Sequence, residues 1–229
     1  MKKIYLGLIA AAVLTATQAM AIPVKVTQPS PGYGGGHGGG EFNISPNITA
    51  ANYGPDVAIF GGFQTFCVQA NVDIVVPGTY NATLSAFDSS GTALSKGTAY
   101  LFMLFATETF PALPGYSYTP GASRTASANS LQQAIWLLQG QSGPNVVDTL
   151  GGNAYVQFAV THFGGGAGGL AAAQSANSNL LPVNIVVLTD RQGNPVQNML
   201  ALVPDGGSAL IMMGMGLSSL ALFARKFRV

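Results

Sequence analysis

Few side chains in this sequence are suited to covalent chemistry. The chain of 229 residues has one cysteine, Cys67, and its two histidines are His37 and His162. Only 7% of the residues are charged, so general acid–base catalysis has few candidate groups. A cysteine reacts as its thiolate, or when its side chain is held against an acyl group. Any chemical function would therefore depend on Cys67.

The histidines give weak support to a hydrolase or a metal site. His37 lies within a glycine run, which cannot hold a ring in a fixed position, and His162 lies at a predicted helix end before three glycines. The acidic residues are scattered singly, unlike the spacing of metal ligands. We expect no metal, no cofactor and no enzymatic activity. A Cys–His hydrolase and an isopeptide cross-link through Lys25 or Lys96 are the less favoured alternatives.

Two glutamine-containing segments change the interpretation of Cys67. The segment 131–136 reads Leu-Gln-Gln-Ala-Ile-Trp and contains the only tryptophan, and the segment 196–200 reads Val-Gln-Asn-Met-Leu. Together with the Phe66-Cys67 pair, they resemble the motifs of the thioester domains of bacterial surface adhesins. The resemblance spans 63–200, most of the chain between its two ends.

The resemblance implies an internal thioester between Cys67 and Gln197, because thioester domains join a cysteine thiol to a distant glutamine carboxamide. It also implies a supporting helix motif, with Leu131 where threonine is usual. The motif residues are Gln132, Ala134, Ile135 and Trp136. Such a bond would acylate an amine or a hydroxyl on a partner. We expect Trp136, with Tyr100 and Tyr155, to keep water away from it. The alternative is a buried, unreactive Cys67 in a passive binding module.

The N-terminus has the pattern of a secretory signal peptide. Lys2 and Lys3 precede an apolar run, and Ala19 and Ala21 provide the small residues of a cleavage site. We expect a signal peptide over 1–21, with cleavage after Ala21. The protein is therefore expected to be exported.

The C-terminus has the pattern of a membrane-spanning helix. The segment 208–224 has no charged residue, and a helix of that length is roughly 26 Å long, close to the thickness of a hydrocarbon core. The basic cluster Arg225, Lys226 and Arg228 follows within the tail 225–229 and would stay on the cytoplasmic side. This places the domain outside the cytoplasm.

A short motif before this span resembles the VPDSG variant of PEP-CTERM sorting signals. The motif at 203–207 consists of Val203, Pro204, Asp205, Gly206 and Gly207, with Gly206 where serine is usual. The resemblance implies recognition of 203–229 by an exosortase-type transpeptidase in a Gram-negative-type envelope. The span would then be a transient inner-membrane anchor, and the destination would be the cell surface or the extracellular matrix.

Between the two ends, the sequence predicts one domain. The segment 22–40 is expected to be flexible because of its Gly/Pro-rich part, and 41–203 to be the folded domain. The part 22–203 has four basic and seven acidic residues, which gives no basic surface for nucleic acid.

Hydrophobic periodicity predicts strands, then helices, then strands. The expected strands are 41–50, 62–70 and 80–87, followed by a closing hairpin of 183–188 and 196–203. Helices are expected after Ser95, which can act as an N-cap, and over 127–139 and 145–162. For 164–179 a loop and a loose helix both remain open. The predicted fold is α+β: an antiparallel β-barrel or sandwich with an inserted helical subdomain at about 95–180, plus the C-terminal transmembrane helix.

The favoured function is a non-enzymatic surface or matrix protein, sorted by its tail, that takes part in adhesion through a Cys67–Gln197 thioester. The alternative function is non-covalent binding by the same exported domain.

Overall fold

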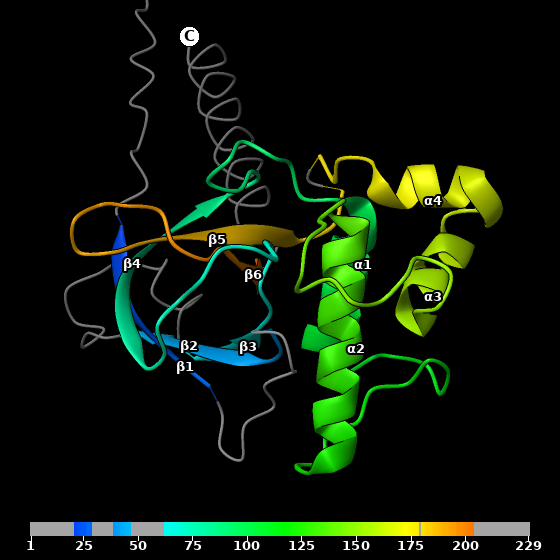
Figure 1. Cartoon of the computed structure of the whole chain (residues 1–229), viewed down its shortest axis with the longest axis horizontal. Helices are drawn as coiled ribbons and strands as arrows, with labels where there is room; N and C mark the ends of the chain where they lie inside the picture. The colour runs from blue at the N-terminus through cyan, green and yellow to red at the C-terminus, as the bar shows by residue number, and fades with distance from the viewer. Residues whose placement is uncertain (1–20, 29–38, 47–61, 179, 204–229) are drawn as a thin grey trace, which may run out of the picture.

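The computed structural model describes residues 21–28, 39–46, 62–178 and 180–203. Within these ranges, six strands form a single antiparallel sheet in the order β3-β2-β1-β4-β5-β6. The strands are β1 (Ile22–Thr27), β2 (Phe42–Pro46), β3 (Phe63–Thr65), β4 (Gly78–Ser85), β5 (Val183–Thr189) and β6 (Met199–Leu202). The sheet curves so that its two edge strands approach each other (Figure 1).

Alternation of buried and less buried side chains explains the central strands. In β1, Ile22, Val24 and Val26 are buried, and in β4 Tyr80 and Ala82 are buried. Because successive side chains of a strand point to opposite faces, these buried residues all lie on the face that points into the barrel. Because β1 pairs with both β2 and β4, the expectation that 22–40 is flexible is wrong for 22–27.

The two edges of the sheet meet along a strip that we call the seam, where 65–69, at and beyond the end of β3, face 197–200. Cys67 forms an isolated antiparallel bridge with Met199. The Thr65 hydroxyl donates to the Leu200 carbonyl at 2.6 Å, and the Leu200 N–H donates to the same hydroxyl at 2.9 Å. The sheet is thus a nearly closed antiparallel barrel, which confirms the predicted α+β class at this level.

The described part of the chain has four helices, all between β4 and β5. They are α1 (Lys96–Ala106), α2 (Ala122–Leu138), α3 (Ala154–His162) and α4 (Gly166–Gln174). They gather on one side of the barrel, with α3 and α4 farther from the sheet than α1 and α2 (Figure 1). Among the helices, α1 makes the most contact with β5 and β6. The helices therefore lie against the edge of the sheet that carries the seam.

Local signals account for some helix ends and miss others. Ser95 caps α1 as predicted, since its hydroxyl accepts from the Thr98 N–H. The helix expected over 145–162 begins only at Ala154, because the Asn153 side chain caps it. The helix expected over 127–139 begins earlier, at Ala122, and the undecided run 164–179 contains α4.

Buried apolar side chains form two clusters. One fills the space between the helices and the sheet and includes Phe66, Phe102 and Leu131. The other fills the barrel and includes Cys67, Trp136 and Met199. Trp136 is the only residue of α2 in the barrel cluster, so this helix contributes one large side chain to the environment of Cys67.

None of the helices in the described ranges is long and apolar enough to cross a membrane. The expected span 208–224 and the basic cluster after it lie outside those ranges, as does most of the expected signal peptide. The sorting motif lies outside them from Pro204 onward. The C-terminal helix thus stays a prediction.

Candidate functional site

The structure brings Cys67 and Gln197 together at the seam. Cys67 lies just beyond β3 and Gln197 just before β6, about 130 positions apart in the sequence. Their exposed fractions are 2% and 1%, and the Gln197 carboxamide lies close enough to the Cys67 thiol to lower its pKa. Gln197 was expected within a strand 196–203, but β6 begins only at Met199. Gln197 therefore lies in the short irregular segment before β6.

The Gln197 carboxamide is held by its nitrogen. Its Nε2–H donates to the backbone carbonyl of Gln69 at 2.6 Å. Its Oε1 is buried and has no hydrogen-bond partner in the part of the chain that the structure describes. In a reaction with the thiol, the nitrogen is the leaving group and the Oε1 stays on the acyl carbon. The contact with Gln69 therefore orients the group that would have to depart.

Gln132 fixes the backbone of Cys67. Its Oε1 accepts from the Cys67 N–H at 3.0 Å, and its Nε2–H donates to the Cys67 carbonyl at 2.7 Å. These paired bonds take the place of a neighbouring strand at this residue. The same Oε1 accepts from the Gly40 N–H at 3.3 Å. Through Gln132, helix α2 thus sets the position of Cys67 and also of the chain before β2.

Trp136 lies on α2 one turn after Gln132 and is 1% exposed. A Cβ placed on Gly39 would come within 2.5 Å of the Gln132 Cγ and 2.7 Å of the Trp136 ring. Only glycine therefore fits at position 39 without displacing these side chains. Gly39 and Gly40 are both buried, and we call them the wall of the site.

The remaining motif residues support α2. Ala134 and Ile135 are fully buried in the cluster between the helices and the sheet, where Leu131 also lies. They pack α2 against the sheet, while Gln132 and Trp136 extend from α2 toward Cys67.

The assignment of this site rests on its geometry and not on similarity to known proteins. No family model, curated protein or solved structure matches the chain. Among the described residues, no group of three or more His, Cys, Asp or Glu side chains could hold a metal ion.

Two expected walls of the pocket lie elsewhere. Tyr100 stacks on the His162 ring at a centroid distance of 3.8 Å, and the Tyr155 hydroxyl donates to the Gly115 carbonyl. Both tyrosines pack with the cluster between the helices and the sheet, whereas Cys67 belongs to the barrel cluster. The expectation that they shield Cys67 is therefore wrong. His162 is occupied by this stacking on α3, which gives no support to a Cys–His pair.

Sequence reasoning missed two residues of the site, Gln69 and Asn198. The Asn198 Nδ2–H donates to the Gln69 Oε1 and to the Ser89 Oγ, both at 2.9 Å, and the Asn198 carbonyl accepts from the Val68 N–H at 2.9 Å. Asn198 is fully buried. Their positions in the sequence could have identified them, since Gln69 lies two residues after Cys67 and Asn198 directly follows Gln197.

The environment of Cys67 makes a free thiol unreactive. Burial raises the pKa of Cys67 from 9.0 to about 12, and the neighbouring Gln197 carboxamide offsets this rise only in part. A free thiol at this position would remain protonated at neutral pH. Reaction with Gln197 would therefore depend on enforced contact between the two groups.

We expect this pKa to make the folded state lose stability above pH 9. The unfolded thiol ionises near pH 9, while the folded thiol holds its proton until about pH 12. Between these values the free energy of unfolding should fall by about 1.4 kcal/mol per pH unit. Urea unfolding of a Gln197→Ala variant, which keeps the thiol free, at pH 8 and pH 10 checks this. A Gln197→Ala/Cys67→Ala double variant should lack this fall in the free energy of unfolding. An equal fall between pH 8 and pH 10 in the two variants would contradict the prediction.

Proposed function

We propose that this protein is an exported, non-enzymatic surface or matrix protein that forms an internal thioester between Cys67 and Gln197. The bond would serve to attach the protein covalently to a partner that carries an amine or a hydroxyl. One observation carries the proposal: a buried thiol and a buried carboxamide, about 130 positions apart, lie side by side at the seam, where Cys67 bridges to Met199 and the Gln197 Nε2–H donates to the Gln69 carbonyl. Holding two reacting groups in contact can lower a barrier by about 7–11 kcal/mol.

The proposed reaction needs no further reagent. The Cys67 sulfur attacks the Gln197 carboxamide carbon, the C–N bond breaks, and the thiol proton leaves on the departing nitrogen as ammonia. In the second step, a partner amine attacks the acyl carbon and the C–S bond breaks. The amine proton then returns to sulfur, which regenerates the Cys67 thiol. The partner stays joined to residue 197 through an amide, or through an ester where a hydroxyl reacts.

Export and sorting form the second part of the proposal. The signal-peptide pattern ends at Ala21 and β1 begins at Ile22, so cleavage there would leave the described strands intact. β6 ends at Leu202, directly before the sorting motif at 203–207. An exosortase-type transpeptidase acting on the tail would therefore act beyond the last strand. This arrangement suits a domain released to the cell surface or the matrix.

A passive binding module is the second candidate function, and the burial of Cys67 favours it. A thiol that is 2% exposed, with its pKa raised to about 12, is also what an unreactive core cysteine has. In that case the Gln197 side chain serves only to hold the Gln69 carbonyl through its Nε2–H.

Intact-mass measurement separates the two candidates. A thioester lowers the mass by one ammonia molecule, and methylamine then yields a product one methylene group heavier than the unmodified chain. Matched Cys67→Ala and Gln197→Ala variants should show neither change. An unmodified mass for the parent chain, with no methylamine product, would contradict the thioester and leave the passive module.

A further inference from the structure

A buried ion pair lies beside the proposed thioester site. Glu41, which directly precedes β2, is fully buried, and its Oε2 accepts from the Arg124 Nε–H at 2.9 Å. The Arg124 Nη2–H donates to the Glu41 Oε1 at 3.1 Å, which makes the pair bidentate. Arg124 lies in the first turn of α2, the helix that carries Gln132. The pair therefore joins the chain before β2 to α2.

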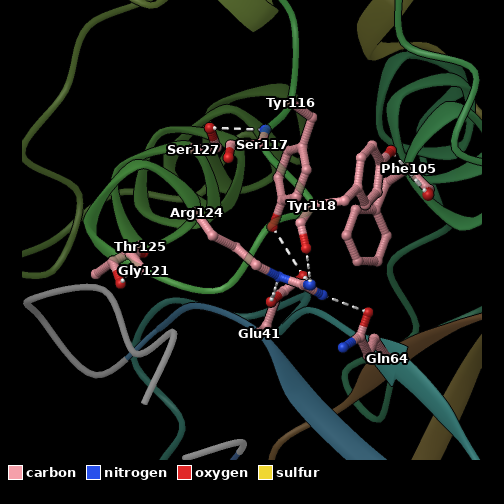
Figure 2. A network of polar contacts seen from close by, with 10 residues as sticks. All are labelled: Glu41, Gln64, Phe105, Tyr116, Ser117, Tyr118, Gly121, Arg124, Thr125 and Ser127. Carbon is pink, nitrogen blue, oxygen red and sulfur yellow. Dashed lines mark hydrogen bonds and ion pairs between the residues drawn. The ribbon is translucent and has the colours of Figure 1, made fainter. Parts of the chain in front are cut away.

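Further polar groups hold Glu41 and Arg124 in this arrangement. The Tyr116 hydroxyl donates to the Glu41 Oε1 at 2.9 Å, and Arg124 also donates to the Gln64 Oε1 at 2.7 Å and to the Tyr118 carbonyl. Figure 2 shows Tyr116 and Arg124 converging on Glu41, with Gln64 on the far side of the guanidinium. Both carboxylate oxygens thus have hydrogen-bond partners, which restrict the Glu41 side chain.

The backbone next to Glu41 is the wall of the site. The Gly40 N–H and the Cys67 N–H donate to the same atom, the Gln132 Oε1. Gly39 is packed so closely on Gln132 and Trp136 that a methyl group would not fit. A shift of Glu41 would therefore move the chain segment that touches Gln132 and Trp136. Those two side chains in turn line Cys67.

Stability alone does not explain this ion pair. Removing two charges from water is costly, and apolar residues of similar size often serve a fold equally well. A bidentate pair is directional, whereas apolar packing is not. It fixes both the position and the orientation of its partners. The pair is thus suited to holding the wall at a defined place.

We infer that the Glu41–Arg124 pair is a clamp that holds Gly39 and Gly40 against Gln132 and Trp136, and that this packing controls the access of water and amines to the Cys67–Gln197 site. Glu41 and Arg124 are positioning residues, since neither contacts the sulfur. The inference rests on the proposed function for its chemical effect. Its structural part, the hold on the Gly40 and Cys67 amides, is independent of that function.

The test uses a Glu41→Leu/Arg124→Met double variant, which removes both charges and keeps apolar bulk so that the domain folds. Because the clamp then no longer holds the wall, hydrogen exchange at the Gly40 amide and at the residue 67 amide should be about tenfold faster, or more, than without the two substitutions. This exchange is measured in a Cys67→Ala background, where no thioester can form. Where Cys67 is retained, water and methylamine should each cleave the thioester of the double variant faster than that of the parent chain, by a similar factor.

An Asp148→Asn variant is the matched control, because it neutralises another hydrogen-bonded carboxylate in the loop before α3. It should leave exchange at both amides unchanged. Equal exchange and equal methylamine rates in the double variant and its parent would overturn the clamp. If the parent chain never loses ammonia but the double variant still exchanges faster at these amides, the thioester proposal fails and the structural hold of the clamp stands.

Discussion

Methylamine treatment of the thioester-linked chain should lower its melting temperature by about 10–20 °C. The proposed bond between residues 67 and 197 would close a loop of about 130 residues. By the chain-entropy relation for cross-links, closing a loop of that length stabilises the folded state by about 5 kcal/mol. For a domain of this size, each kcal/mol corresponds to about 2–4 °C. Calorimetry before and after the amine is added measures the difference.

The Gln197→Ala variant is the control for this experiment. It lacks the link from the start, so its melting temperature should be low and should not respond to methylamine. A parent chain that consumes the amine without a change in melting temperature would show that the link does not constrain the unfolded chain.

Replacing Gln132 with leucine should lower the free energy of unfolding by about 3–9 kcal/mol. The change removes the partners of the Cys67 N–H, the Cys67 carbonyl and the Gly40 N–H, all of which are buried. Each buried polar group left without a partner costs about 1–3 kcal/mol. Because Cys67 then loses its fixed position, the loss of ammonia should also become undetectable by intact mass. Urea unfolding measures the stability change.

Gln174→Leu is the matched control for this prediction. Gln174 makes one exposed hydrogen bond, to the Leu137 carbonyl at the end of α2. Its replacement should change the free energy of unfolding by less than about 0.5 kcal/mol. If Gln132→Leu falls in the same range, Gln132 is not what holds Cys67.

The parts of the fold that follow from local patterns were predictable. The alternation in 80–87 gives β4, and the Ser95 hydroxyl begins α1, because both signals act over a few residues. The helix motif around Trp136 indicated α2 by the same kind of local spacing. The Cys67–Gln197 pair was predicted from a family resemblance, since no local pattern relates residues so far apart.

Other features depend on partners distant in the sequence, and so escaped prediction. β1 was hidden because it lies between the predicted signal peptide and a glycine-rich run, although it is central to the sheet. Glu41 and Arg124 were read only as two of a few charges, because nothing in the sequence relates them across 83 positions. Where strand β6 begins depends on its pairing with β5, which the pattern of 196–203 does not define.

The seam also decides how the protein would carry a mechanical load. β1 lies near the start of the chain and β6 near its end, while the proposed bond joins residue 67 to residue 197. Tension applied between the two ends would pass through that bond and bypass 68–196, which contain β4, β5 and the four helices of the described chain. Most of the domain would then stay folded under a pull that straightens the segments outside the bond. A surface protein built this way would lengthen little before its attachment gave way.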